Sequence, residues 1–287
     1  MIRKILVASA LVIAGAGFAP VAAAAESTYP LERAPNRQSD MIALQNGARL
    51  FVNHCLNCHS ANVMRYNKLA DLGLTDEQIK DNLLFTSDKV GDMMNVAMSP
   101  KDASAWFGTA VPDLSVMARA KSVNAGPSGA DYIYTYLRTF YRDAHQPSGW
   151  NNLVFPSVAM PHVMWADQGP RELTATTMHQ KPAQNGRPGG WERITTVTDA
   201  QGFTQTKRED VPHYNGQASI DYRFKAAQPH LAGQYDRDVA DLTGFLAWMA
   251  DPSQLERKRL GAYVLLFLGL FFVVAWRLNA SYWKHVR

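Results

Sequence analysis

The chain has 287 residues, which is long enough for one large domain or two small ones with an ordinary buried core. Hydrophobic residues make up 47% of it and charged residues 19%, a balance typical of a globular protein with a membrane element. The net charge is +4, but all 25 acidic residues and only 24 of the 29 basic ones lie in the span 26–259, which therefore carries −1. We expect no nucleic acid among the partners.

The first 25 residues have the pattern of a secretory signal peptide. Arg3 and Lys4 precede a short apolar run, and a string of alanines follows that ends at Ala25. An uncleaved membrane anchor is the alternative, but the run is short and rich in small residues. We expect a mature protein that begins near Glu26 and is exported.

Capping residues and apolar spacing predict four helices in the exported part. Ser39 or Asp40 can cap a helix that runs into the segment 51–58. Thr75 with Gln78 forms a capping box for a second helix, and Ser128 with Asp131 starts a third. The last helix is marked by apolar residues at helical spacing, which are Val239, Leu242, Leu246 and Met249.

Residues 165–235 differ from the rest in being rich in Gly, Pro, Gln and Thr. We expect a long irregular insertion with little helix. Within it, the alternating run RITTVTDAQGFTQT predicts a β-hairpin that turns around Asp199 to Gly202.

An uncharged stretch near the C-terminus is long enough to cross a membrane. LGAYVLLFLGLFFVVAW covers residues 260–276, or about 25 Å of helix. A buried core helix is the alternative, but basic residues at 257–259 and 277 bracket the stretch and aromatic residues lie near both of its ends. We predict a transmembrane anchor over residues 259–278.

The orientation of this anchor cannot be read from flanking charge, because three basic residues precede the apolar stretch and three follow it. The signal peptide decides the matter. Residues 26–258 are expected outside the cytoplasmic membrane as the exported domain, and residues 279–287 inside as a short tail.

Chemistry is concentrated in one motif, since Cys55 and Cys58 are the only two cysteines and His59 follows directly. An exported pair could form a small disulfide loop. A zinc site usually needs four ligands, and no second Cys or Cys/His pair is present, while a thioredoxin-like pair would not require the histidine. C-x-x-C-H is the attachment pattern of c-type haem, in which both thiols reach the porphyrin vinyl groups and the imidazole binds iron. We predict a covalent haem.

The sixth iron ligand decides the class of function. A thioether suits one-electron transfer, whereas an open site would suit a peroxidase or a gas sensor. Met160 is the preferred candidate because Pro156 and Pro161 hold it in an extended strap. Met164 is the second candidate, and His162 would give an iron with two histidine ligands.

Five segments in the right order resemble the cytochrome c1 family, the haem subunit of bacterial cytochrome bc1 complexes. They are CLNCHS at 55–60, VPDLSVMARA at 111–120, GADYIYTYLRTF at 129–140, AMP at 159–161 and YDRDVADLTGFLAWMADPSQLERKRLG at 235–261. The first is common to all c-type cytochromes, and PDLS and DPSQLERKRLG are more particular. The implied fold is mainly α: a cytochrome c-like haem domain with a long low-helix insertion and a single C-terminal transmembrane helix.

The resemblance also implies a set of site residues, with one haem c bound covalently through Cys55 and Cys58. His59 and Met160 are then the axial ligands. The remaining haem contacts that it implies are Arg119, paired with a propionate, Pro112, packed near the ring, and Tyr132, near a propionate. The family often follows that arginine with His-Gly-Gly, whereas this chain has AKSVNAGPSGA, so the local loop is expected to differ.

The implied role is one-electron transfer, without catalytic residues of its own, from the Rieske iron–sulfur protein to a soluble or membrane-bound cytochrome c. Cytochrome b, the lipid bilayer and a dimeric complex complete the implied surroundings, in a bacterial inner membrane with the haem domain on the periplasmic side. A tethered cytochrome that serves a terminal oxidase is the alternative. An acidic stretch at 71–92 is expected to be a solvated face that could steer a basic cytochrome c.

Overall fold

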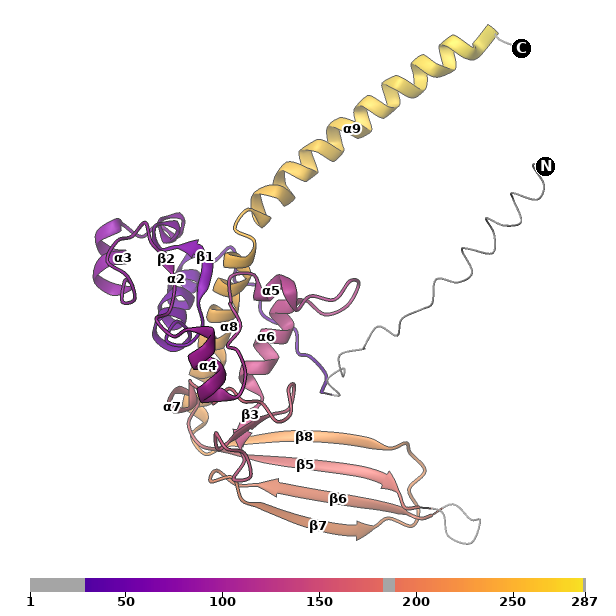
Figure 1. Cartoon of the computed structure of the whole chain (residues 1–287). Coiled ribbons are helices and arrows are strands. Elements are labelled where there is room, and N and C mark those ends of the chain that lie inside the picture. The colour runs from indigo at the N-terminus through magenta and orange to yellow at the C-terminus, as the bar shows by residue number, and fades with distance from the viewer. Residues whose placement is uncertain (1–28, 183–188, 286–287) are drawn as a thin grey trace, which may run out of the picture. The chain divides into compact units, whose positions relative to one another are not determined.

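The structure is a computed structural model of the chain, and it describes residues 29–182 and 189–285 (Figure 1). The predicted signal peptide, residues 1–25, lies outside the described residues. The helices are α2 (Met41–Leu50), α3 (Asp76–Asn82), α4 (Pro100–Phe107), α5 (Met117–Ala120), α6 (Gly129–Arg138), α7 (Trp165–Gln168), α8 (Pro229–Ala250) and α9 (Gln254–Tyr282), with a π-helical turn η1 (Phe51–Cys55) and 3₁₀ turns η2 (Tyr66–Leu72) and η3 (Trp283–His285). The strands are β1 (Ala61–Arg65), β2 (Met93–Met94), β3 (Phe140–Arg142), β4 (Trp150–Asn152), β5 (Arg171–Gln180), β6 (Trp191–Thr198), β7 (Thr204–Asp210) and β8 (Ser219–Ala226).

The capping residues predicted from the sequence begin the helices that they were expected to begin. Asp40, rather than Ser39, caps α2, since its carboxylate accepts a hydrogen bond from the backbone N–H of Ala43. Thr75 forms a capping box with Gln78 at the start of α3, and Ser128 forms one with Asp131 at the start of α6. These three helix starts are confirmed. Local hydrogen bonds are sufficient to fix them.

The core of the helical part is the contact between α2 and α8. Gly47 allows their close approach, because a Cβ atom there would lie 2.3 Å from the backbone oxygen of Asp241 and 2.6 Å from Cβ of Phe245. The ring of Phe51 then packs on that of Phe245, with 5.6 Å between ring centres. Every residue predicted to mark the last soluble helix is buried in α8. The polypeptide therefore enters the cysteine motif from a tightly packed helix.

The helix α6 is held on both of its ends. At its start, Gly129 lies so close to the backbone oxygen of Ala118 in α5 that a Cβ atom would approach it to 2.1 Å. At its end, the guanidinium of Arg138 pairs with Asp236 of α8 at 2.7 Å and with Glu32. Fixing α6 in this way fixes the tyrosines that it carries.

We predicted an irregular insertion over residues 165–235, and this prediction is wrong. The segment contains a regular antiparallel sheet in the order β7-β6-β5-β8. The content of helix is low, as expected: only α7 and the start of α8 fall in the segment. The predicted hairpin is confirmed as β6–β7, with Asp199 and Gly202 in its turn and Gly202 at φ +94°. β5 has three threonines and no regular apolar alternation, so its own sequence is a weak strand signal, and its pairing with β6 and β8 decides its conformation. β8 does alternate apolar and polar residues, at Ile220, Tyr222 and Phe224, and this pattern was missed.

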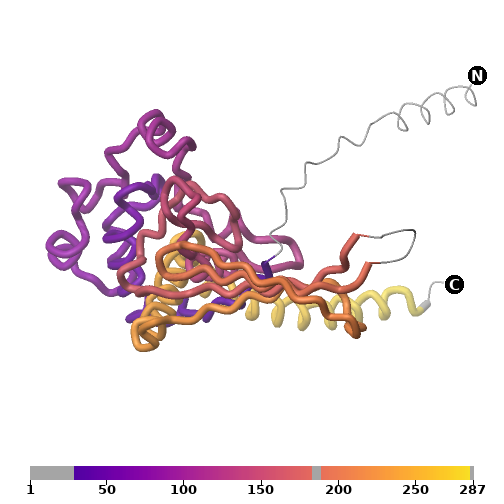
Figure 2. Tube along the Cα trace, turned by 90° about the horizontal axis from the view of Figure 1, so that it is seen from below, coloured from indigo at the N-terminus to yellow at the C-terminus, as the bar shows by residue number. Residues whose placement is uncertain are grey.

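Two sets of hydrogen bonds to backbone oxygens join this sheet to the preceding part of the chain. Arg171, the first residue of β5, donates hydrogen bonds to the backbone oxygens of Arg138, at 2.8 Å, and Phe140. The hairpin turn is held by a 3.2 Å bond from the N–H of Ala144 to the oxygen of Gly202. The strands β5 to β8 lie side by side in Figure 1, and Figure 2 shows the same part of the chain from below.

The C-terminal helix α9 has 29 residues, a mean hydropathy of 2.0 over its most apolar window and no buried residue. It is the one described helix that is long and apolar enough to cross a membrane, which confirms the expected single C-terminal transmembrane helix. The helix begins before and ends after the predicted span 259–278, since polar residues at both ends continue the helical turn.

Candidate haem site

The cysteine motif lies in a tight turn that directly continues α2. The π-helical turn η1 ends at Cys55, and the oxygen of Cys55 then accepts hydrogen bonds from the N–H groups of Cys58, at 3.0 Å, and His59, at 2.8 Å. These two backbone hydrogen bonds bring two thiols and an imidazole together within five residues. Both cysteines are free thiols in the structure, so the disulfide loop is not formed. Burial, reinforced by Cys58, raises the pKa of Cys55 to about 12, which keeps its thiol neutral.

The imidazole of His59 is oriented by a backbone oxygen. Its Nδ1 lies 2.7 Å from the carbonyl oxygen of Pro112. Because a carbonyl can only accept, Nδ1 carries the proton and Nε2 keeps its lone pair for a metal. Burial lowers the pKa of His59, which favours this neutral form. The imidazole is therefore prepared as a ligand through Nε2.

The segment that carries Pro112 is itself tied to the residues that follow the motif. The N–H of Leu114 donates to the oxygen of Ser60 at 2.9 Å, and the carboxylate of Asp113 accepts from the N–H of Asn62 at 2.7 Å. Consequently Cys55, Cys58, His59 and Pro112 form one group of predicted site residues that the structure brings together.

Met160 and Tyr132 belong to a second group, linked by Tyr136. The hydroxyl of Tyr136 donates a hydrogen bond to the sulfur of Met160 at 3.4 Å, and its ring stacks on that of Tyr132 with 6.0 Å between ring centres. The close contact of α5 with α6 connects the two groups, because α5 follows the Pro112 segment and α6 carries both tyrosines. Sequence reasoning missed Tyr136, although its position four residues after Tyr132 places both rings on one helix face.

The two other candidates for the sixth ligand are core residues. His162 is 1% exposed, stacks on Phe140 at 4.9 Å and meets the ring of Trp150 edge-on at 5.0 Å. Its Nε2 is engaged with the side-chain oxygen of Gln168 at 3.1 Å, and burial is the main cause that lowers its pKa to about 3. Met164 is also 1% exposed and belongs to the hydrophobic core. Met160, by contrast, is partly exposed.

Arg119 and Tyr132 lie beside different charged side chains. Arg119 is exposed, and its charge helps to lower the pKa of Asp251, although Arg257, which bonds to that carboxylate, is the larger cause. The cation beside Tyr132 is Lys121, whose Nζ lies 4.7 Å from the ring centre. Lys121 was not singled out from the sequence, where lysine in a loop has no distinguishing pattern.

The side chains present fit a covalently attached haem. Two free thiols, a histidine with its Nε2 lone pair available and a partly exposed thioether are the donor set that such a group requires. They do not fit zinc, since no group of three or more His, Cys, Asp or Glu side chains that could hold a metal ion occurs in the described part of the chain.

Comparison with known proteins agrees with this chemistry. The model of the Cytochrome C1 family matches residues 32–181 and 222–286. A cytochrome c1 of Allochromatium vinosum is 37% identical over 286 residues, which are 99% of each chain. A protein of Nitrosomonas europaea named ammonia monooxygenase gamma subunit is 38% identical over 256 residues, covering 89% of this chain and 88% of that one. A cytochrome c1 of Rhodospirillum rubrum is 24% identical over 308 residues, covering 100% and 98%.

These matches extend over most of the chain and include the motif, the Pro112 segment, α6, the strap with Met160 and the anchor. The expected cofactor, one covalent haem c, is confirmed by them, as is a place in an inner membrane with a single span. The chain belongs to the cytochrome c1 family and is an electron-transfer subunit of a cytochrome bc1 complex, in which cytochrome b and the Rieske protein are its partners.

Proposed function

We propose that this chain receives single electrons from the Rieske iron–sulfur protein and passes them to a cytochrome c through a haem ligated by His59 and Met160. The bound haem supplies the one-electron couple of iron. The observation that carries the assignment is the 2.7 Å contact between Nδ1 of His59 and the oxygen of Pro112, because it fixes the tautomer that a ligand needs.

Each side chain has a definite task in this proposal. Cys55 and Cys58 would hold the cofactor permanently through thioether bonds. His59 would bind iron through Nε2, and its bond to Pro112 holds the imidazole plane in place. Met160 offers a thioether whose electron density is reduced by the Tyr136 hydroxyl, which favours the reduced state. The site therefore acts on the potential and exposure of the cofactor and moves no substrate proton.

For the haem propionates, we favour Lys121 as the cation and Tyr132 as its neighbour. The support is the position of the Lys121 ammonium over the Tyr132 ring, on the helix whose Tyr136 contacts Met160. The pairing of Arg119 with a propionate stays a prediction, and its side chain is exposed. Lysine in place of arginine would give a single point charge rather than a bidentate fork.

The haem domain is proposed to face the periplasm, with residues 1–25 removed, the anchor at 259–278 and the tail 279–287 in the cytoplasm. The same proposal places the chain in a dimeric complex. The orientation is tested by adding a protease to intact spheroplasts, where it should cleave the haem domain from outside.

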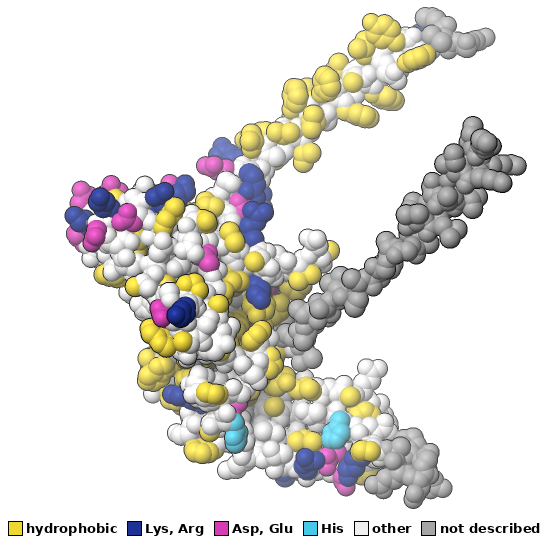
Figure 3. Space-filling view, in the orientation of Figure 1, with side chains coloured by type: hydrophobic (Ala, Val, Ile, Leu, Met, Phe, Trp, Pro, Cys, Tyr) yellow, Lys and Arg dark blue, Asp and Glu magenta, His cyan; other side chains and the backbone are white. Residues whose placement is uncertain are grey.

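A soluble or membrane-bound cytochrome c is the acceptor, and the exposed acids on and around α3 would steer it if it is basic. Figure 3 shows acidic side chains gathered over α3, mixed with basic ones.

The assignment is tested by purifying the chain from membranes and recording its redox difference spectrum. Met160→Leu should abolish the weak sulfur-to-iron charge-transfer band of the ferric protein and open the site to cyanide, whereas Met164→Leu should keep the band. Retention of the band in Met160→Leu would overturn the choice of ligand. A wild-type protein that binds cyanide as readily as the variant would favour the peroxidase or sensor class instead.

The surrounding complex is tested by what co-purifies. Cytochrome b and an iron–sulfur protein are expected. Recovery of a terminal oxidase in their place would support the tethered-cytochrome alternative, and recovery of monooxygenase subunits would assign the chain to the complex for which one relative is named.

A further inference from the structure

A recess beside the start of α9 gathers basic side chains outside the haem site. It has a volume of about 720 Å³ and is lined by the segment 33–38, by α5 and the loop after it, by α8 and by the first turns of α9. Its cationic lining residues are Arg33, Arg37, Arg119 and Lys258, and its acidic ones are Asp131 and Asp251. Figure 3 shows Lys and Arg side chains gathered where α9 begins.

The acidic groups of the recess are already occupied. The carboxylate of Asp131 accepts hydrogen bonds from the N–H groups of Ala34 and Ser128, both at 2.8 Å. That of Asp251 is bound by both terminal nitrogens of Arg257, at 2.5 and 2.6 Å. Neither carboxylate is therefore left to neutralise the arginines by direct contact.

Two guanidinium groups of the recess have no hydrogen-bond partner among residues 29–182 and 189–285. Arg33 and Arg119 are both exposed, and their described interactions are electrostatic ones with Asp131 and Asp251. Arg37 differs, since it pairs with Asp40 at 3.7 Å and Asp241 at 3.6 Å. The recess thus offers two guanidinium forks that match the geometry of a phosphate.

A buried hydroxyl without a partner also lines the recess. Thr243 is 1% exposed, and its Oγ1 makes no hydrogen bond within the described part of the chain. A buried hydroxyl without a partner costs free energy, and a ligand oxygen in the recess would remove that cost. This observation is independent of the arginines and points to the same ligand chemistry.

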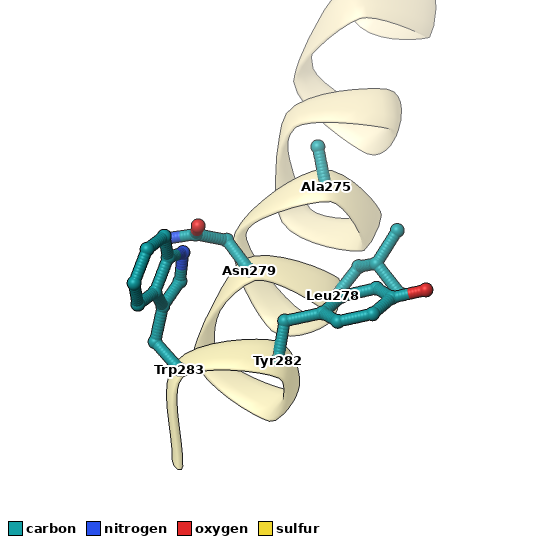
Figure 4. Close-up of a pocket in the computed structure, with 5 residues that line it drawn as sticks. All are labelled: Ala275, Leu278, Asn279, Tyr282 and Trp283. Atoms are coloured by element: carbon teal, nitrogen blue, oxygen red, sulfur yellow. The ribbon is translucent and has the colours of Figure 1, made fainter. Parts of the chain in front are cut away.

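The location of the recess selects the source of the phosphate. Gln254 and Lys258 belong to the first turns of α9, and the uncharged stretch of the anchor begins at Leu260. The recess therefore opens where lipid headgroups lie. A second hollow, at the other end of α9, is lined by Ala275, Leu278, Asn279, Tyr282 and Trp283 and has no charged lining residue, so it offers no such site (Figure 4).

We infer that this recess binds the phosphodiester group of an anionic membrane phospholipid, held by Arg33, Arg119 and Lys258 and by the hydroxyl of Thr243. The bound lipid fixes the haem domain against the membrane surface at the base of its anchor. Of the residues that line the recess, only Arg119 was also predicted to contact the haem, and the inference does not depend on which residue is the sixth iron ligand.

The test uses the full-length haem-loaded protein in a mild detergent and native mass spectrometry with added lipid. Phosphatidylglycerol should remain bound, whereas phosphatidylcholine should not. Arg33→Gln with Arg119→Gln should weaken phosphatidylglycerol binding about 30-fold, from the loss of two cations at the headgroup. Arg208→Gln with Arg223→Gln removes the same charge from the exposed sheet and should leave binding unchanged.

A second variant separates the site from general charge attraction. Thr243→Val keeps the shape and net charge and should weaken binding several-fold. A haem spectrum equal to that of the wild type would show that each variant is folded. Equal losses in both arginine pairs, equal retention of phosphatidylcholine, or displacement of the lipid by inorganic phosphate at the same concentration would each overturn the lipid site. In the last case the recess is a site for free anions.

Discussion

The cysteine motif and the β6–β7 hairpin show two different ways in which this chain holds a segment in place. The motif is fixed by backbone hydrogen bonds that converge from η1, from the turn itself and from the Pro112 segment. The hairpin is fixed by strand register, by hydrogen bonds within its turn and by one bond from Ala144 to Gly202, and β7 is exposed along nearly its whole length. The family match covers the first and omits residues 182–221, which contain the second.

The difference indicates where change is tolerated. Removing any contact at the motif shifts an atom that must bind a cofactor, so small displacements are costly. Removing the hairpin exposes one edge of a sheet whose other strands keep their register. We expect effects on the haem to decrease steadily from the motif to the hairpin.

The largest effect is expected at the two thiols. Cys55→Ser with Cys58→Ser removes both sites of covalent attachment, so the chain should carry no haem after boiling in detergent. A haem stain on a denaturing gel, compared with an immunoblot for the chain, measures this. A pigmented band at the mass of the double variant would contradict the attachment.

The packing of α2 on α8 should be nearly as sensitive. Gly47→Ala places a methyl group 2.3 Å from the backbone oxygen of Asp241, and it should lower the free energy of unfolding by about 3 kcal/mol. Gly91→Ala is the control, because no atom lies within 4 Å of its added Cβ. Thermal unfolding followed at the haem band measures both. Equal melting temperatures would show that the helices can separate without cost.

A moderate effect is expected at Tyr136. Tyr136→Phe removes the donor to the Met160 sulfur, which strengthens the thioether as a donor and should lower the midpoint potential. A bond worth of order 1 kcal/mol corresponds to about 40 mV for one electron. Tyr134→Phe, on the same helix, is the control, and redox titration is the measurement. A potential that changes equally in both variants would show that the hydroxyl acts only through the packing of α6.

The smallest effect on the haem is expected from the hairpin. Replacing residues 181–218 by a short glycine-rich turn joins β5 to β8, which are already paired in the sheet. The reduced haem spectrum and the midpoint potential should remain those of the full chain. Loss of haem would show that β6 and β7 support the haem site, and that the hairpin is as important to the cofactor as the cysteine motif.

The parts of the fold that were predictable are those decided by nearby residues. The caps at Asp40, Thr75 and Ser128 lie within three residues of the groups that they bind, and the hairpin turn depends on Asp199 and Gly202 alone. The anchor was predictable because the absence of charge is a local property. Its ends were not, since helical turns continue into polar residues.

The sheet and part of the site required contacts between distant residues. β5 and β8 pair across a gap of about 40 residues, and the threonine-rich sequence of β5 has no strong pattern of its own. The neighbours of Lys121 and Tyr136 likewise depend on how α5 and the strap pack on α6. The motif itself was readable because three adjacent residues carry its chemistry.

The atom that orients His59 belongs to the main chain. Every amino acid has a carbonyl oxygen, so no replacement of Pro112 can delete the acceptor, and only a change in the path of the polypeptide can move it. A single substitution at residue 112 therefore leaves the acceptor that orients this imidazole in place. Insertions and deletions between residues 60 and 112 would move that acceptor.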